Sequence, residues 1–212
     1  MKIFKKALPI AMAASILPIT FAASMMSPAS SNAEPAPIHH EVVVPLSITE
    51  AWDQWTTPTG LQSFFAREAI VEPEVLGEYS IHFFPENTPG TRGAEGMRIL
   101  AFEPEDRIAF TWNAPPHLPL AREQLALVEI TFDEVSENRT RVTLHHDHFG
   151  RNADSGAARA YFNAAWLVIL ARSAYAAING SVDFDNLPEG LAFRGPSRDE
   201  LLEMAEQEAA AE

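Results

Sequence analysis

Hydrophobic and polar residues follow two different periods along this chain, and the change occurs near residue 155. In residues 157–179, a stretch without Gly or Pro, apolar side chains recur every three to four residues while Arg159 and Arg172 fall between them. We therefore predict a long helix that is capped by Asp154 or Ser155 and ends at Gly180.

Before this helix, short apolar runs of period two alternate with turn residues. They predict strands at residues 39–46, 68–72, 77–84, 96–103, 107–113, 125–135 and 139–149. Two short helices are expected after the first strand, one opened by a capping box of Ser47 and Glu50 and one at 58–65 with Pro58 in its first turn. The long helix is the only obvious cover for the sheet. The expected fold class is α+β, with six or seven antiparallel strands wrapped on a long C-terminal helix.

The two ends of the chain differ from this pattern. Residues 1–33 combine Lys2, Lys5 and Lys6 with an apolar stretch and small residues before position 34, which is typical of a secretory signal peptide. A retained membrane anchor is the alternative, and Pro9 and Pro18 argue against it. We thus divide the chain into a signal peptide (1–33), a folded domain (38–180) and an acidic tail (181–212). The tail contains a helix from a second capping box at 197–200 to about residue 209, with few apolar residues, so we expect it to dock weakly or not at all.

Charge and composition narrow the range of partners. All three Lys lie in the predicted signal, which leaves 12 Arg against 29 acidic residues and a formal charge of 12 − 29 = −17. Such a surface disfavours nucleic acid and anionic membranes as partners of the mature form. The absence of Cys excludes disulfides and thiol chemistry. We expect a periplasmic or secreted protein, with cleavage after about Ala33.

The run His145-His-Asp-His148 is the one candidate metal site. Alternation along a strand places His146 and His148 on one face and the other two side chains on the opposite face, so a site would need Glu129 or His82 as well. A polar strand end explains the run better, and we predict neither a metal nor a cofactor. No Gly-x-Ser-x-Gly motif is present. His146 and His148 remain weak candidates for a catalytic acid or base.

Several segments together resemble a known superfamily. They are AWDQWTTPTGL (51–61) followed by Phe64-Phe65, GEY (77–79), GMRIL (96–100), PEDRIAFTW (104–112), VTL (142–144) and WLVIL (166–170). Their order resembles the SRPBCC (START-like, birch-pollen-allergen-like) superfamily, in the branch homologous to the activator of the heat-shock protein 90 ATPase. The resemblance covers residues 40–179 and implies a helix-grip fold. Ala165 is a departure, because the branch commonly has Gly there.

The resemblance implies a cavity between sheet and long helix that holds a small hydrophobic molecule. An exported protein would not meet a cytosolic chaperone ATPase, so the family name is not taken as the function. The aromatic and aliphatic residues expected to line the cavity are Trp52, Trp55, Phe64, Tyr79, Ile81, Phe83, Phe110, Trp112, Val128, Ile130, Phe162, Trp166 and Leu170. A proline-rich loop with Pro115, Pro116 and His117 would form its gate.

The nature of the ligand is inferred from the charges expected nearby. Arg98 and Arg141 are the only cations expected near the cavity, so we predict a neutral or weakly polar ligand. Two alternatives remain open. One is an enzyme of the superfamily's cyclase or hydrolase-like kind that uses a cavity histidine. The other is a protein-interaction or chaperone-like module, whose acidic tail could recruit a basic partner that the sequence does not identify.

Overall fold

A five-stranded antiparallel sheet forms the larger part of the fold. The structure is a computed structural model that describes residues 33–210, so the predicted signal peptide lies outside the described residues apart from Ala33. The strand order is β1 (Ile38–Val44), β8 (Arg139–Asp147), β7 (Ala126–Ser136), β6 (Arg107–Trp112) and β5 (Ile99–Glu103). Alternate side chains of β7 and β8 are buried, as the period-two pattern predicts.

A second, three-stranded antiparallel sheet continues from the first. It contains β2 (Glu68–Val71), β3 (Tyr79–His82) and β4 (Gly93–Ala94), of which β4 was not predicted. The Tyr79 N–H donates to the Met97 carbonyl (2.9 Å) and the Ile99 N–H to the Gly77 carbonyl (3.0 Å), which connects the start of β3 to the start of β5 and so links the two sheets. The predicted fold class is confirmed, with the strands divided between two sheets.

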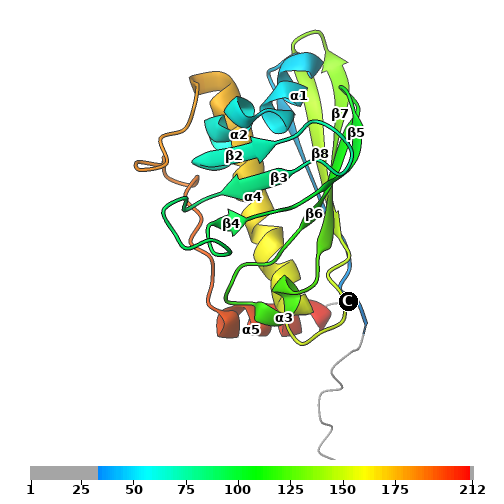
Figure 1. The fold of residues 1–212 in the computed structure, drawn as a ribbon, viewed down its shortest axis with the longest axis vertical. Helices are drawn as coiled ribbons and strands as arrows, with labels where there is room; N and C mark the ends of the chain where they lie inside the picture. The colour runs from blue at the N-terminus through cyan, green and yellow to red at the C-terminus, as the bar shows by residue number, and fades with distance from the viewer. Residues whose placement is uncertain (1–32, 211–212) are drawn as a thin grey trace, which may run out of the picture. The chain divides into compact units, whose positions relative to one another are not determined.

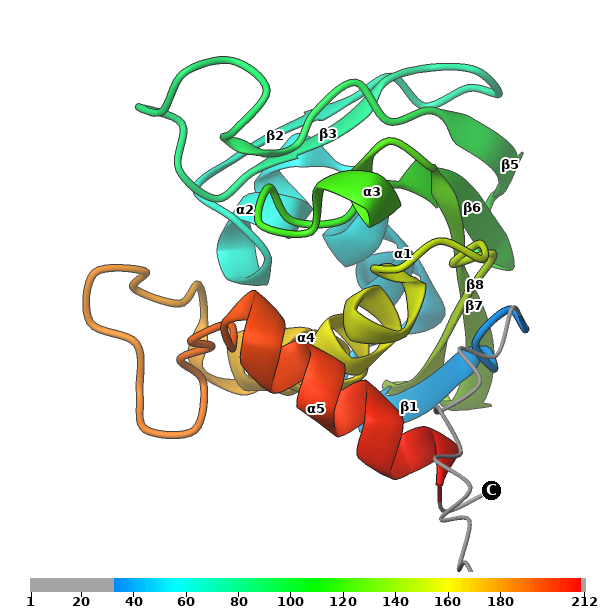
Figure 2. The ribbon, with the colours of Figure 1, turned by 90° about the horizontal axis from the view of Figure 1, so that it is seen from below.

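The long helix α4 (Ser155–Asn179) lies across the concave face of both sheets, as Figures 1 and 2 show. Helices α1 (Ile48–Thr56) and α2 (Pro58–Phe64) close one end, and the capping box of Ser47 and Glu50 is formed as predicted. A buried polar pair fixes α1 against α4. Gln54 Nε2 donates to the Ser173 carbonyl (3.2 Å), and the Ser173 hydroxyl donates to Gln54 Oε1 (2.6 Å).

Asp154 precedes α4, but its side chain does not cap the helix. Its carboxylate accepts hydrogen bonds from the Leu120 N–H (3.0 Å), in the short helix α3 (Pro119–Arg122), and from Nη2 of Arg198 (2.7 Å). Asp154 is 1% exposed. This carboxylate therefore ties α3 and the C-terminal helix to the start of α4, a role that its sequence position did not indicate.

The acidic C-terminal helix α5 (Arg198–Ala209) packs against the first half of α4, as Figure 2 shows. Leu201 is fully buried, and Arg159 of α4 forms an ion pair with Glu208. Gly156 permits the close approach, because a Cβ there would lie 3.1 Å from the Cβ of Ala205. The helix therefore docks on α4, through one buried leucine and an ion pair at each end of the helix. That this docking is weak stays a prediction.

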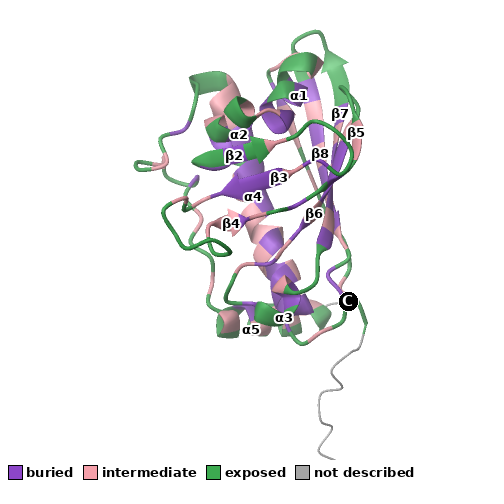
Figure 3. Cartoon of the chain, viewed as in Figure 1, coloured by how far each residue is buried: buried purple, intermediate pink, exposed green. Residues whose placement is uncertain are grey.

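The buried residues gather on the inner faces of the sheets and on one side of α4 (Figure 3). By length and composition, α4 is the one described helix that could cross a membrane. Its buried side includes Phe162, Trp166, Ile169 and Leu170, which all belong to the hydrophobic core. Its apolar character thus has an explanation within the domain.

Candidate functional site

The centre of the fold, next to α1 and α2, is filled by aromatic side chains. The Tyr79 and Phe110 rings stack with centroids 4.2 Å apart, and the Trp55 and Phe64 rings lie 4.9 Å apart. The Tyr79 hydroxyl donates to the Trp55 carbonyl (2.9 Å), and burial raises its pKa. These rings are fully buried and in contact with one another, which is the close packing of a protein interior.

Nine residues expected to line a cavity belong instead to this packed region or to its flanks. They are Trp52, Trp55, Phe64, Tyr79, Ile81, Phe110, Val128, Ile130 and Leu170, all of them buried and none of them part of the cavity wall. Trp52 lies farther out and packs edge-on against Phe102 and Phe132, with centroids 5.1 and 5.4 Å away. The correction has a simple cause: α1 and α2 supply enough side chains to close this end of the space.

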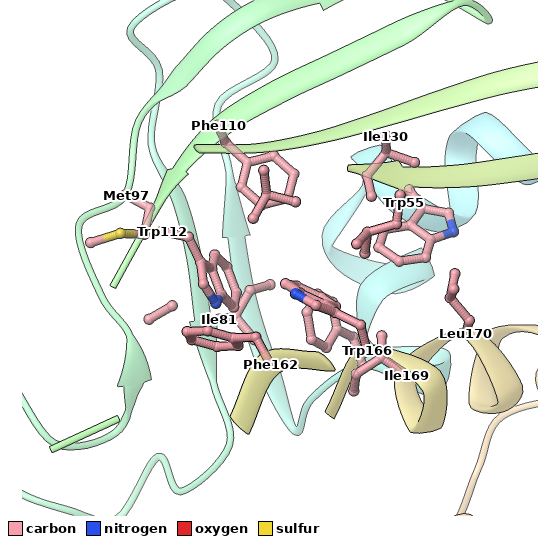
Figure 4. Packing of buried hydrophobic residues seen from close by; sticks show 14 of the residues in the cluster. Trp55, Ile81, Met97, Phe110, Trp112, Ile130, Phe162, Trp166, Ile169 and Leu170 are labelled. Carbon is pink, nitrogen blue, oxygen red and sulfur yellow. The ribbon is translucent and has the colours of Figure 1, made fainter. Parts of the chain in front are cut away.

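A cavity of about 500 Å³ opens beside the packed centre, along the middle of α4. Phe83, Trp112, Phe162 and Trp166 line it, as expected from the sequence. Figure 4 shows that Trp112, Phe162 and Trp166 approach one another from the sheet and from α4. The Trp112 and Trp166 rings have centroids 5.5 Å apart. Phe65 rather than Phe64 completes this aromatic wall, because Phe64 turns toward Trp55.

Loops rather than helices or strands form most of the rest of the wall. The proline-rich loop contributes Pro115, Pro116 and His117, the residues expected to form a gate. The His117 ring lies 5.8 Å from that of Tyr161, and partial burial lowers its pKa while Asp154 opposes the shift. The loop before β4 contributes Thr91 and Arg92, and β4 itself contributes Gly93 and Ala94.

The segment between α4 and α5 supplies a wall that sequence reasoning missed. Phe184, Leu187, Ala192, Phe193 and Gly195 line the cavity, although they lie beyond the domain boundary drawn at residue 180. The Val182 N–H donates to the Ser63 carbonyl (2.8 Å), which holds this segment against α2. Spaced aromatic residues in an otherwise irregular acidic tail were the available signal.

Four arginines also line the cavity: Arg67, Arg92, Arg122 and Arg172. Arg98 and Arg141, the two cations expected nearby, do not: Arg98 donates to the Leu76 carbonyl, and Arg141 lies near Glu41. The premise of the neutral-ligand prediction is therefore wrong. The four arginines lie in helices and loops, and the fold brings them together. The periodicity of the strands could not indicate that they line one cavity.

His146 is fully buried and does not line the cavity. Its Nδ1 accepts a hydrogen bond from Trp166 Nε1–H (2.8 Å), so the ring proton lies on Nε2, which has no partner among the described residues. Burial holds the pKa of His146 well below its usual value. With its lone pair occupied and no path to the cavity, His146 is placed to orient Trp166 rather than to transfer a proton to a ligand.

His148 lies outside the strand on which it was placed. β8 ends at Asp147, and His148 adopts a left-handed conformation (φ 63°) with an exposed side chain. It therefore does not share a face with His146. No group of three or more metal-ligating side chains occurs within residues 33–210. The geometry supports neither histidine as a catalytic acid or base of the cavity.

The fold and its side cavity define a protein of the SRPBCC, helix-grip class. The sequence profile described as Activator of Hsp90 ATPase homolog 1-like protein matches residues 45–172, more than half of the chain. The chain therefore belongs to this family. A comparison with curated proteins gives no match.

Solved structures share the fold at low sequence identity. A conserved protein of unknown function from Enterococcus faecalis aligns with a TM-score of 0.55 and 15% identity over 82% of this chain and 85% of its own. CalU16 from Micromonospora echinospora gives a TM-score of 0.52 and 17% identity over 82% and 86%. The Aha1 dimer from Colwellia psychrerythraea gives 0.52 and 18% over 69% and 98%. At these identities the likeness shows the fold alone. Proteins of this family and its SRPBCC relatives bind ligands or proteins.

Proposed function

We propose that the mature chain is an exported binding module that holds a small, mostly apolar molecule in the cavity beside α4. The observation that carries this proposal is an aromatic-walled space of about 500 Å³ next to the buried hydrophobic core. Pockets of about this size and character are typical of small-molecule sites. Burial against the aromatic wall would supply roughly 25 cal/mol per Å² of apolar area.

Substitutions on α4 can test this proposal with a matched control. Ala165 lines the cavity, whereas Ala171 is exposed and does not. We expect the neutral fluorescent dye Nile red to bind the protein, Ala165→Phe to weaken binding by occupying part of the space, and Ala171→Phe to leave it unchanged. An unchanged affinity in Ala165→Phe, or no binding to the unaltered protein, would reject the cavity as the site.

Export is the second part of the proposal and rests on the sequence of residues 1–33. The basic start, the apolar stretch and the small residues before position 34 support it. We expect the protein isolated from its native cells to begin at about Glu34 and to be recovered from the periplasmic or external fraction. An intact N-terminus in the cytosolic fraction would contradict export without affecting the cavity.

A further inference from the structure

One of the four arginines that line the cavity differs from the others in its partners. Arg67 forms an ion pair with Asp185 (2.7 Å), and Arg92 lies 3.3 Å from Glu95. The two terminal nitrogens of Arg122 donate hydrogen bonds to the backbone carbonyls of residues 90, 93 and 114. Arg67 and Arg92 therefore each lie beside a carboxylate, and the terminal nitrogens of Arg122 are occupied by backbone carbonyls.

Arg172 has one hydrogen bond only: its Nε donates to the Leu191 carbonyl (2.7 Å). Neither of its terminal nitrogens has a partner among the described residues, and neither is sealed from solvent. Arg172 is nevertheless 7% exposed. It is thus a nearly buried cation that lines the cavity and retains free donors.

The contrast with Arg67 shows what Arg172 lacks. Hydrogen bonding to Asp185 raises the pKa of Arg67, whereas burial lowers the pKa of Arg172 with no carboxylate opposing the shift. Both guanidinium groups lie 6.0 Å from the Phe184 ring, so they share a neighbourhood but not a counter-ion. A buried cation without an anion is costly, and an anion supplied by a ligand would remove that cost.

The position of Arg172 on α4 defines the shape of such a ligand. Phe162, Ala165, Ile169 and Arg172 are spaced by three or four residues and line the cavity from the same face of α4. From Phe162 to Arg172 the helix rises about 15 Å. An elongated molecule could therefore lie with its apolar body against Phe162 and Trp166 and its charged end at Arg172.

The charged group of the ligand follows from the free donors of Arg172. Among the four arginines, Arg172 is nearly buried and has terminal nitrogens with neither a hydrogen bond nor a carboxylate in the described chain, and these two nitrogens match the two oxygens of one carboxylate. We propose, building on the binding function above, that the cavity takes a small apolar monocarboxylate whose carboxylate pairs with Arg172. This replaces the neutral ligand expected from the sequence.

The test compares decanoate with decanol, which share a chain length, as displacers of bound Nile red near neutral pH. We expect decanoate to displace the dye at a concentration about ten- to a hundredfold lower than decanol does, because a charge-assisted hydrogen bond in a buried site adds affinity of this size. Arg172→Gln should abolish this preference while leaving decanol unaffected, because its amide can still donate to the Leu191 carbonyl. Arg67→Gln, in the same wall, should keep the preference.

A purely structural role for Arg172 would weaken both displacers equally in Arg172→Gln, and that result would overturn the proposal. So would equal potency of the two displacers on the unaltered protein, or a preference that persists in Arg172→Gln. Arg172→Lys keeps the charge without the planar fork and should retain part of the preference, which gives a second test if Arg172→Gln does not fold. If Nile red itself does not bind, the binding function fails rather than the choice of ligand.

Discussion

Aromatic residues line both halves of the space between the sheets and α4, yet one half is solid and the other is hollow. Around Trp55 and Phe64, helices α1 and α2 lie opposite the sheet, and their side chains fill the space between the helices and the sheet. Around Phe162 and Trp166, loops stand opposite, and the cavity of about 500 Å³ remains. A helix presents a dense row of side chains to a surface, whereas a loop must keep its backbone polar groups solvated. The kind of element that covers the sheet therefore decides where the space remains.

Removing a phenylalanine from the solid half should have the largest effect. Phe64 is fully buried and contacts Trp55 and Phe65. We expect Phe64→Ala to lower the free energy of unfolding by about 3–5 kcal/mol, because close-packed neighbours cannot collapse into the space. Urea denaturation measures the loss. A loss of less than about 1 kcal/mol would mean that this half is not tightly packed.

Leu201 tests the docking of α5 on α4. Because Leu201 is fully buried under α4, Leu201→Ala should cost about 2–3 kcal/mol, at the low end of the range for such deletions. Met204 is 41% exposed, and Met204→Ala is the matched control with a small expected effect. Equal, negligible losses in thermal or urea unfolding would indicate that α5 contributes nothing to stability.

His146 adds a pH dependence to stability. Its folded pKa lies well below the unfolded value near 6.5, so below pH 6.5 the unfolded chain takes up a proton that the folded protein does not. Stability should therefore fall with decreasing pH, by up to about 1.4 kcal/mol per unit for this group. His146→Gln should reduce that slope between pH 6.5 and pH 5. An unchanged slope would show that His146 takes up its proton in the folded state.

Phe83 gives the smallest effect and completes the comparison with Phe64. Phe83 is half-buried, lines the cavity and contacts Phe65 with centroids 5.8 Å apart. Phe83→Ala should cost about 1 kcal/mol, since its side chain already borders open space and less area returns to water. Losses of equal size for Phe64→Ala and Phe83→Ala would erase the distinction between the two halves.

Part of the fold could be predicted from periodicity and local chemistry. The long helix, the two capping boxes and the strand pattern depend on interactions between residues close in sequence, so they can be predicted from the sequence. Asp154 was misjudged because its partners, Leu120 and Arg198, are 34 and 44 residues away. The partners of α5 on α4 could not be predicted for the same reason.

The sequence by itself determined the α+β class, with antiparallel strands on a long helix, and an aromatic interior, because side-chain period and residue type set which faces turn inward. It could not distinguish the aromatic residues that fill the centre from those that line a cavity, since Phe64 and Phe65 are adjacent and chemically identical. Only the tertiary structure decided that, by placing α1 and α2 over one half and loops over the other. It also decided the charge of the site. Arg172 differs from Arg67 only in what the folded chain brings near it: an Asp185 carboxylate pairs with Arg67, and no described carboxylate pairs with Arg172.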